Sequence, residues 1–242
     1  MEYKCNAAGR LHEFLETARR LNVDMPIKQV WAKVFDIDTE DPLPVFRHLA
    51  HMMALTDEIE QKVRKIDGIN QDLLLRHLPK IRQGLSASNL DTGWRHCSNH
   101  ITEAAVTDLE YCADAISRSY VENEIEEADL AKIKEELDEV FESIRTANLN
   151  KDLQAILLDL VEEMRRSIAA YRIRGATLLQ KTFTRSLGEL LARHQEILAI
   201  REEPSFKSFL KVLRIIDTAL AKAQQHRPIL EAAINQFLPL VS

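Results

Sequence analysis

The sequence predicts an all-α fold, a multi-helix bundle of about nine helices with a smaller amino-terminal helical part. Residues that favour helices dominate the composition, and there are only six Gly and seven Pro in 242 residues. Apolar residues recur at three- and four-residue steps along almost the whole chain, whereas no alternating run is long enough to propose a strand. With 45% hydrophobic residues, the chain has enough apolar surface to form a substantial core.

The amino-terminal part, residues 1 to 84, is predicted to contain short helices and one longer helix. Two short apolar stripes lie within residues 11–34, and a longer stripe runs from Phe46 to Ile66. Pro79 lacks a backbone donor, so we expect a kink or two short pieces around it rather than one straight helix.

Residues 85 to 93, LSASNLDTG, form the clearest predicted loop. They collect Ser, Asn, Asp and Gly, which satisfy the backbone of turns or adopt positive φ. We therefore expect a boundary here between the amino-terminal part and a carboxy-terminal helical bundle of residues 94 to 242. One continuous domain is the alternative.

Long apolar stripes predict the helices of this bundle, and no proline lies between Trp94 and Glu203. The stripes run from Ile101 to Tyr120, from Leu130 to Ile144 at nearly heptad spacing, and from Leu153 to Tyr171. A further helix is expected to follow a cap at Ser205, and a last one to begin at Pro228.

Two features of the middle of the bundle leave alternatives open. Either Asn148 or Asn150 can cap the helix that carries the third stripe. Gly175 interrupts the next stretch, but a glycine costs only about 1 kcal/mol in a helix interior. Residues 150 to 202 therefore form either two helices or one bent helix.

The cysteines and the charge indicate a cytoplasmic protein. Cys5, Cys97 and Cys112 are odd in number, far apart and without a CxxC pair, which argues against a disulfide framework. The amino terminus lacks the apolar core of a secretory signal, and no stretch has the 18 apolar residues of a membrane span. The net charge of −6 gives no general attraction to nucleic acid or to an anionic membrane, so we expect no membrane partner.

The stretch RHCSNH, residues 95 to 100, concentrates the residue types that carry chemistry. His96 and His100 are four apart, so on a helix they would share a face with Glu103 and could bind one metal ion. The stretch is not HExxH, however, and no second His/Cys pair stands at finger-like spacing. We therefore predict no metal site and no cofactor, and a polar helix start at which Cys97 faces the core.

Arg95 and His100 are also separated by four residues, and this pair resembles the R-x4-H motif of HEPN-type ribonucleases. The resemblance covers six residues of 242. It implies an all-helical enzyme in which the arginine and histidine, usually across a dimer, position the 2′-hydroxyl and phosphate for metal-independent cleavage. Arg95 and His100 are then the candidate catalytic residues. An ordinary polar helix start is the competing interpretation.

The distribution of charge offers a broader signal. Residues 121–142 contain ten acidic and two basic residues, whereas residues 164–194 contain seven basic residues and one acidic residue. Neighbouring helices with complementary faces would explain this contrast. A basic patch that binds an acidic partner protein or nucleic-acid phosphates is the functional alternative. Its candidate partner-binding residues are Arg165, Arg166, Arg172, Arg174, Lys181 and Arg185.

These signals favour a non-enzymatic function. We expect a helical protein-interaction or regulatory subunit that binds a protein partner or associates with itself, with nucleic acid as a second partner class for the basic patch. The alternative is a HEPN-like ribonuclease of a toxin or phage-defence system.

Overall fold

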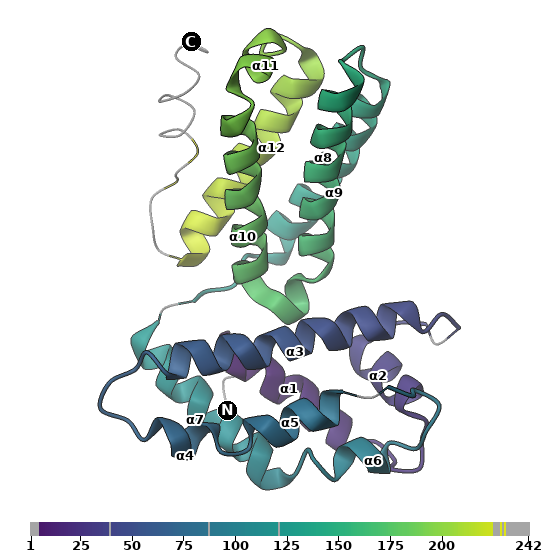
Figure 1. Cartoon of the computed structure of the whole chain (residues 1–242), viewed down its shortest axis with the longest axis vertical. Helices are drawn as coiled ribbons and strands as arrows, with labels where there is room; N and C mark the ends of the chain where they lie inside the picture. Colours follow the sequence, from purple (N-terminus) through teal and green to yellow (C-terminus); the bar gives the residue numbers. More distant parts are fainter. Residues whose placement is uncertain are drawn as a thin grey trace. The chain divides into compact units, whose positions relative to one another are not determined.

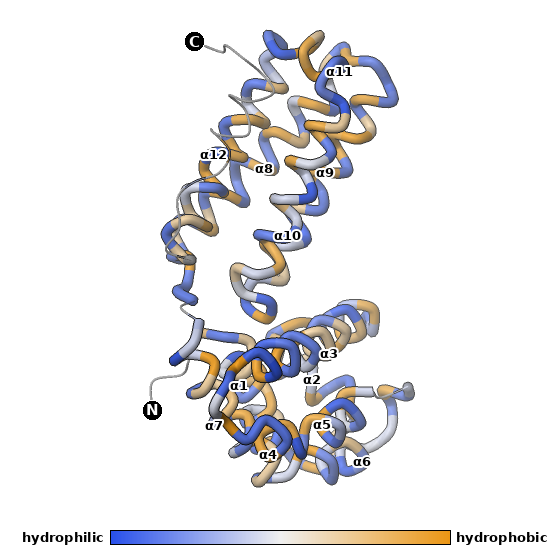
Figure 2. Tube along the Cα trace, turned by 60° about the vertical axis from the view of Figure 1, so that its left-hand side comes forward, coloured by the Kyte–Doolittle hydropathy of each residue, from blue (hydrophilic) through white to orange (hydrophobic). Residues whose placement is uncertain are grey.

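The computed structural model describes residues 5–38, 40–86, 88–120 and 122–224, together with Pro228 and Leu230. The regular elements found in these residues are all helices, labelled α1 to α12 in Figure 1. The predicted all-α fold class is confirmed. Around each helix, apolar and polar residues alternate as expected of amphipathic helices (Figure 2). None of the helices in the described ranges combines the length and apolar character needed to cross a membrane.

The chain forms two compact units. Unit 1 contains the residues up to Glu122 and the segment Arg172–Arg174, and unit 2 contains Asn123–Tyr171 and the residues from Gly175 onward. The division after Glu122 differs from the expected boundary at residues 85–93.

Unit 1 is built from α1 to α7. Their bounds are α1 Ala7–Arg19, α2 Ile27–Phe35, α3 Leu43–Val63, α4 Gln71–Leu75, α5 Leu78–Leu85, α6 Arg95–Ser98 and α7 Glu103–Ser119. α1 packs against both α3 and α7, and the core of the unit includes the fully buried Trp31 and Trp94. Pro79 lies in the first turn of α5, so this stretch is two short helices, one of the two expected outcomes.

Residues 85–93 belong to unit 1, where they and the two residues that follow are hydrogen-bonded to the start of α2 and to the connection before it. Backbone amides donate from Ile27 to Thr92 O (2.9 Å), from Lys28 to Leu90 O (2.9 Å), from Trp94 to Met25 O (2.8 Å) and from Arg95 to Val23 O (2.9 Å). Trp94 then enters the core beside Trp31, with ring centroids 5.2 Å apart. A turn-rich composition therefore marks a loop inside a unit here, and not a linker between units.

Three residues from later in the chain complete unit 1. Arg10 on α1 donates through Nε to Ile173 O (3.0 Å) and through Nη2 to Arg174 O (3.3 Å). Ile173 is buried in the core of unit 1, and the Arg172 guanidinium lies 5.4 Å from the ring centroid of Phe14. The segment is thus held by backbone acceptors, apolar burial and a cation–π contact.

Unit 2 is built from α8 Glu127–Thr146, α9 Lys151–Ala169, most of α10 Tyr171–Ala192, α11 His194–Ala199 and α12 Pro204–Gln224. α8 packs against both α9 and α12. Ile133, Leu137 and Ile144 are fully buried, as their nearly heptad spacing predicts. Asn150 caps α9, because its side chain accepts a hydrogen bond from the amide of Asp152 at 2.9 Å.

The stretch of residues 150–202 is not one bent helix. α9 ends at Ala169, and inside α10 Gly175 has φ 58° and ψ −158°, which is outside the helical region and favours glycine. The predicted Ser205 cap is wrong: α12 begins at Pro204, and Ser205 is buried in its first turn. The helix expected from Pro228 lies mostly outside the described residues.

Candidate functional site

The stretch RHCSNH does not form the helical face that a two-histidine site requires. α6 ends at Ser98, and α7 begins only at Glu103 after a cap by Thr102, so His96 and His100 are not on one helix. The expectation that Cys97 faces the core is correct, since its side chain is buried. Among the described residues, no group of three or more His, Cys, Asp or Glu is arranged to hold a metal ion.

The two candidate catalytic residues have separate surroundings. The Arg95 guanidinium is exposed and lies 2.9 Å from the carboxylate of Asp24. His100 is half-buried, and in the described part of the chain no hydrogen bond or ion pair joins it to Arg95. The ribonuclease hypothesis therefore stays a prediction based on two residues.

The six basic candidates for partner binding are divided between the units. Arg172 and Arg174 belong to unit 1, whereas Arg165, Arg166, Lys181 and Arg185 belong to unit 2. Arg174 is only 7% exposed, and its guanidinium lies 3.9 Å from the Glu58 carboxylate. Burial lowers the pKa of Arg174, although the nearby Glu58 carboxylate opposes that effect.

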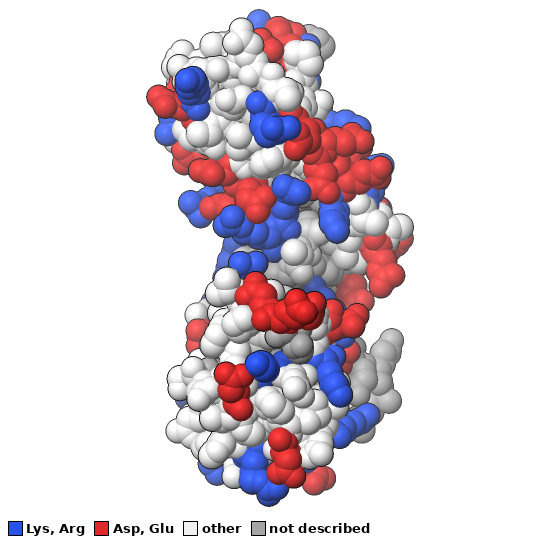
Figure 3. Space-filling view, turned by 90° about the vertical axis from the view of Figure 1, so that its right-hand side faces the viewer, with Lys and Arg blue, Asp and Glu red and all other residues white. Residues whose placement is uncertain are grey.

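Most of the unit 2 arginines are engaged by carboxylates of the chain itself. Arg165 on α9 lies 2.7 Å from Asp138 on α8, and Arg185 on α10 lies 2.8 Å from Glu163 on α9. Basic and acidic side chains accordingly lie next to one another over unit 2, in the upper part of Figure 3. The Arg165–Asp138 pair joins the acidic range 121–142 to the basic range 164–194, as expected if the charge contrast reflects complementary faces of neighbouring helices.

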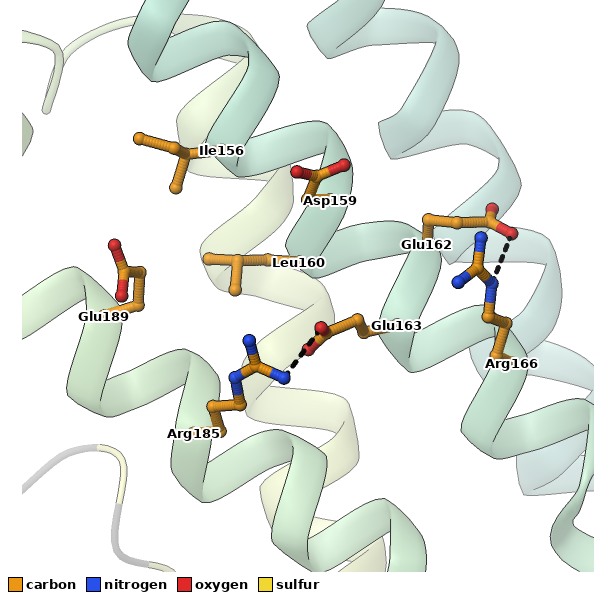
Figure 4. Close-up of a pocket in the computed structure, with 8 residues that line it drawn as sticks. All are labelled: Ile156, Asp159, Leu160, Glu162, Glu163, Arg166, Arg185 and Glu189. Carbon is orange, nitrogen blue, oxygen red and sulfur yellow. Dashed lines mark hydrogen bonds and ion pairs between the residues drawn. The ribbon is translucent and has the colours of Figure 1, made fainter. Parts of the chain in front are cut away.

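A cavity of about 410 Å³ lies between α9 and α10 in unit 2. Its size is within the roughly 300–1,000 Å³ of typical ligand pockets. Its lining combines apolar and charged side chains: Ile156, Asp159, Leu160, Glu162, Glu163 and Arg166 from α9, and Arg185 and Glu189 from α10 (Figure 4). The helical spacing of residues 156, 159, 160 and 163 places their side chains on one side of α9.

Two ion pairs border this cavity. Arg185 reaches from α10 to Glu163 on α9, and Arg166 lies beside Glu162 at 3.2 Å, within α9 (Figure 4). The sequence identifies Arg166 and Arg185 as binding residues, but not the carboxylates around them. Their acidic partners, Glu162 and Glu163, lie just before residues 164–194, the range that the basic charge contrast covers, so that contrast does not reveal a cavity with both signs.

A second polar cluster, in unit 1, centres on Asp108. Its carboxylate accepts hydrogen bonds from Arg76 Nε and Nη2 (2.8 and 3.0 Å) and lies 2.7 Å from His77 Nδ1. Burial alone would raise the pKa of Asp108, but the hydrogen bonds from Arg76 and His77 lower it below its usual value. The sequence contains one signal for this cluster, an acidic residue on a buried apolar stripe. Asp108 lies three residues after Ala105 and four before Cys112, on the apolar stripe of α7.

A carboxylate placed like that of Asp108 can orient the His77 imidazole as a general base. A reaction also needs a nucleophile and space for a substrate. The nearest thiol is unsuited to the first role, because burial and the Asp108 charge raise the pKa of Cys112 to about 12. The described cavity lies in the other unit. The Asp108 cluster therefore joins the corner between α4 and α5 to α7, and the α9–α10 cavity is the candidate binding site.

Comparison with models of known protein families, with curated proteins and with solved structures found no match to this chain. Its function must therefore be argued from its own residues.

Proposed function

We propose that this chain is a cytoplasmic, non-enzymatic protein-interaction or regulatory subunit. The observation that carries the proposal is the cavity between α9 and α10, with apolar Ile156 and Leu160 beside a charged rim. An apolar centre surrounded by polar groups is the usual anatomy of a protein–protein contact, in which one anchoring side chain fills a pocket. The thiols of Cys97 and Cys112, neither of which is in a disulfide, support the cytoplasmic part of the proposal.

The surroundings of the other candidate groups support binding over catalysis. Burial raises the pKa of the Cys97 thiol to about 11, so almost none of it is the reactive thiolate at neutral pH. The exposed Arg95 pairs with Asp24, as an ordinary surface arginine does.

Co-purification of the full chain from its own cells, followed by quantitative mass spectrometry and by light scattering, tests the proposal. We expect either an enriched partner or a self-associated mass. Ile156→Gln should lower that enrichment or association at least fivefold, because it places an amide in the apolar part of the cavity. Ile215→Gln is the matched control, since Ile215 is also half-buried in unit 2 but does not line the cavity.

Two results would contradict the proposal. The first is a chain that is monomeric and enriches no protein. The second is a partner or a self-association that both variants retain equally.

A further inference from the structure

The charged groups around the α9–α10 cavity are not balanced. Four carboxylates line it, from Asp159, Glu162, Glu163 and Glu189, against two guanidiniums. Both guanidiniums already have a carboxylate partner, in the Arg166–Glu162 and Arg185–Glu163 pairs. An acidic partner would therefore compete with a carboxylate of this chain for either arginine.

The remaining carboxylates are more available to a ligand. Glu189 pairs with Arg193 at 2.8 Å, a residue that does not line the cavity. Asp159 is exposed, and its side chain has no ion pair or hydrogen bond within the described ranges of the chain. Asp159 and Glu189 lie on different helices at the edge of the cavity, with Leu160 between them (Figure 4).

The apolar part of the lining further limits the type of side chain that could enter the cavity. Ile156 and Leu160 offer a surface for a hydrocarbon stem, beside the carboxylate of Asp159 (Figure 4). Lysine and arginine are the side chains that combine an apolar stem with a cationic head. The carboxylates and the apolar part of the lining therefore favour the same two residue types, lysine and arginine.

We propose that the α9–α10 cavity receives a lysine or arginine side chain from a basic segment of a partner protein, with Asp159 as the residue that binds the cation. This inference rests on the proposed function, because it names the partner class for that same site. It also reverses the sign of the partner expected from the basic residues of this region alone.

Fluorescence anisotropy with labelled helical peptides tests the inference directly. The probes are three peptides of alanine and leucine that differ at two positions one helical turn apart, which are lysine, norleucine or glutamate. We expect the lysine peptide to bind the full chain at low ionic strength, and its affinity to fall as salt screens the charges. The norleucine and glutamate peptides should bind at least tenfold more weakly.

Variants of the full chain locate the binding. Asp159→Lys should weaken the lysine peptide about tenfold or more, and Asp159→Asn should weaken it less, because it removes the charge without reversing it. Glu135→Lys is the control: it makes the same change of charge at an exposed position of α8, outside the cavity. Equal loss in the Glu135 variant, or equal binding of the lysine and glutamate peptides, would overturn the inference.

The two proposals fail separately. If Ile156→Gln releases a co-purifying partner while the lysine peptide does not bind, the interaction function stands and the basic partner class is wrong. If the chain enriches no partner and does not self-associate, the function falls, whatever the peptides do.

Discussion

At the scale of single residues, Asp108 is a buried charge that the fold stabilises by hydrogen bonds. Its side chain is 8% exposed and is bonded by Arg76 and His77 across two elements. Replacement by asparagine removes the charge and one of the two acceptor oxygens, and it puts an NH2 donor in place of that oxygen, next to the nitrogens of Arg76 and His77. We expect Asp108→Asn to lower the free energy of unfolding by about 2–3 kcal/mol, measured by urea denaturation at neutral pH.

The lowered pKa of Asp108 also sets the sign of a pH effect. Its stabilising contribution is complete above the usual pKa of 3.8 and is lost as the pH falls through the lower pKa of the folded state. The acid loss of stability should therefore be shallower in Asp108→Asn than in the wild type. Glu135→Gln, at an exposed position, should leave both the midpoint and the acid slope unchanged. An Asp108→Asn chain with wild-type stability would show that the cluster contributes nothing.

The ribonuclease hypothesis is also decided at single residues. Because the Arg95–Asp24 pair is exposed, Arg95→Ala should change stability by less than about 1 kcal/mol, and loss of activity could not be attributed to unfolding. If the hypothesis holds, Arg95→Ala and His100→Ala each abolish cleavage of single-stranded RNA. A wild-type chain that leaves such RNA intact would contradict the ribonuclease hypothesis.

At the scale of elements, apolar spacing predicts the long helices well because each must bury one stripe. The buried seam of α8 follows from local sequence alone, and local sequence limits the cap of α9 to Asn148 or Asn150, of which Asn150 is the cap in the structure. Short elements do not: four-residue α6 has too few residues to show a period, so the end of the helix at Ser98 could not be foreseen. Neither could the start of α12 at Pro204, where proline and serine both mark helix starts.

Gly175 is the position in α10 where the backbone decides the structure. Its φ of 58° with ψ −158° is a conformation that residues with a Cβ rarely adopt. We expect Gly175→Ala to lower the free energy of unfolding by about 1–3 kcal/mol. Gly188→Ala is a matched control in the same helix, where an added Cβ meets no atom within 4 Å.

That control should be neutral or stabilising by up to about 1 kcal/mol, because alanine favours helix more than glycine does. Chemical denaturation of both variants measures the contrast. If the two substitutions had the same effect, the positive φ of Gly175 would not constrain the chain.

At the scale of the whole molecule, the residues that the structure describes form two hydrophobic cores, one in each unit. Composition signals turns but does not say what a turn touches, so residues 85–93 look like a boundary in sequence although their backbone bonds lie inside unit 1. The location of the cavity was likewise not predictable, because it requires α9 and α10 to be adjacent along a shared face. The sequence therefore predicts the helices, but it does not predict which helices and loops pack against one another.

Two cores predict two calorimetric transitions in the full chain. Asp108→Asn should shift only the transition of unit 1, and Leu157→Ala, which removes a fully buried side chain in unit 2, should shift only the other. Removing such a side chain costs about 2–5 kcal/mol. A single transition that moves by the same amount in both variants would mean that the two cores unfold together.

The segment Arg172–Arg174 has a consequence for the order in which the protein forms on the ribosome. Arg10 is synthesised before α8 and α9, but the carbonyls of Ile173 and Arg174 that it binds appear only after both helices have been made. Domains of nascent chains generally fold from the amino terminus as they emerge. Unit 1 can therefore form its contacts with Arg172–Arg174 only after α8 and α9 of unit 2 have been translated.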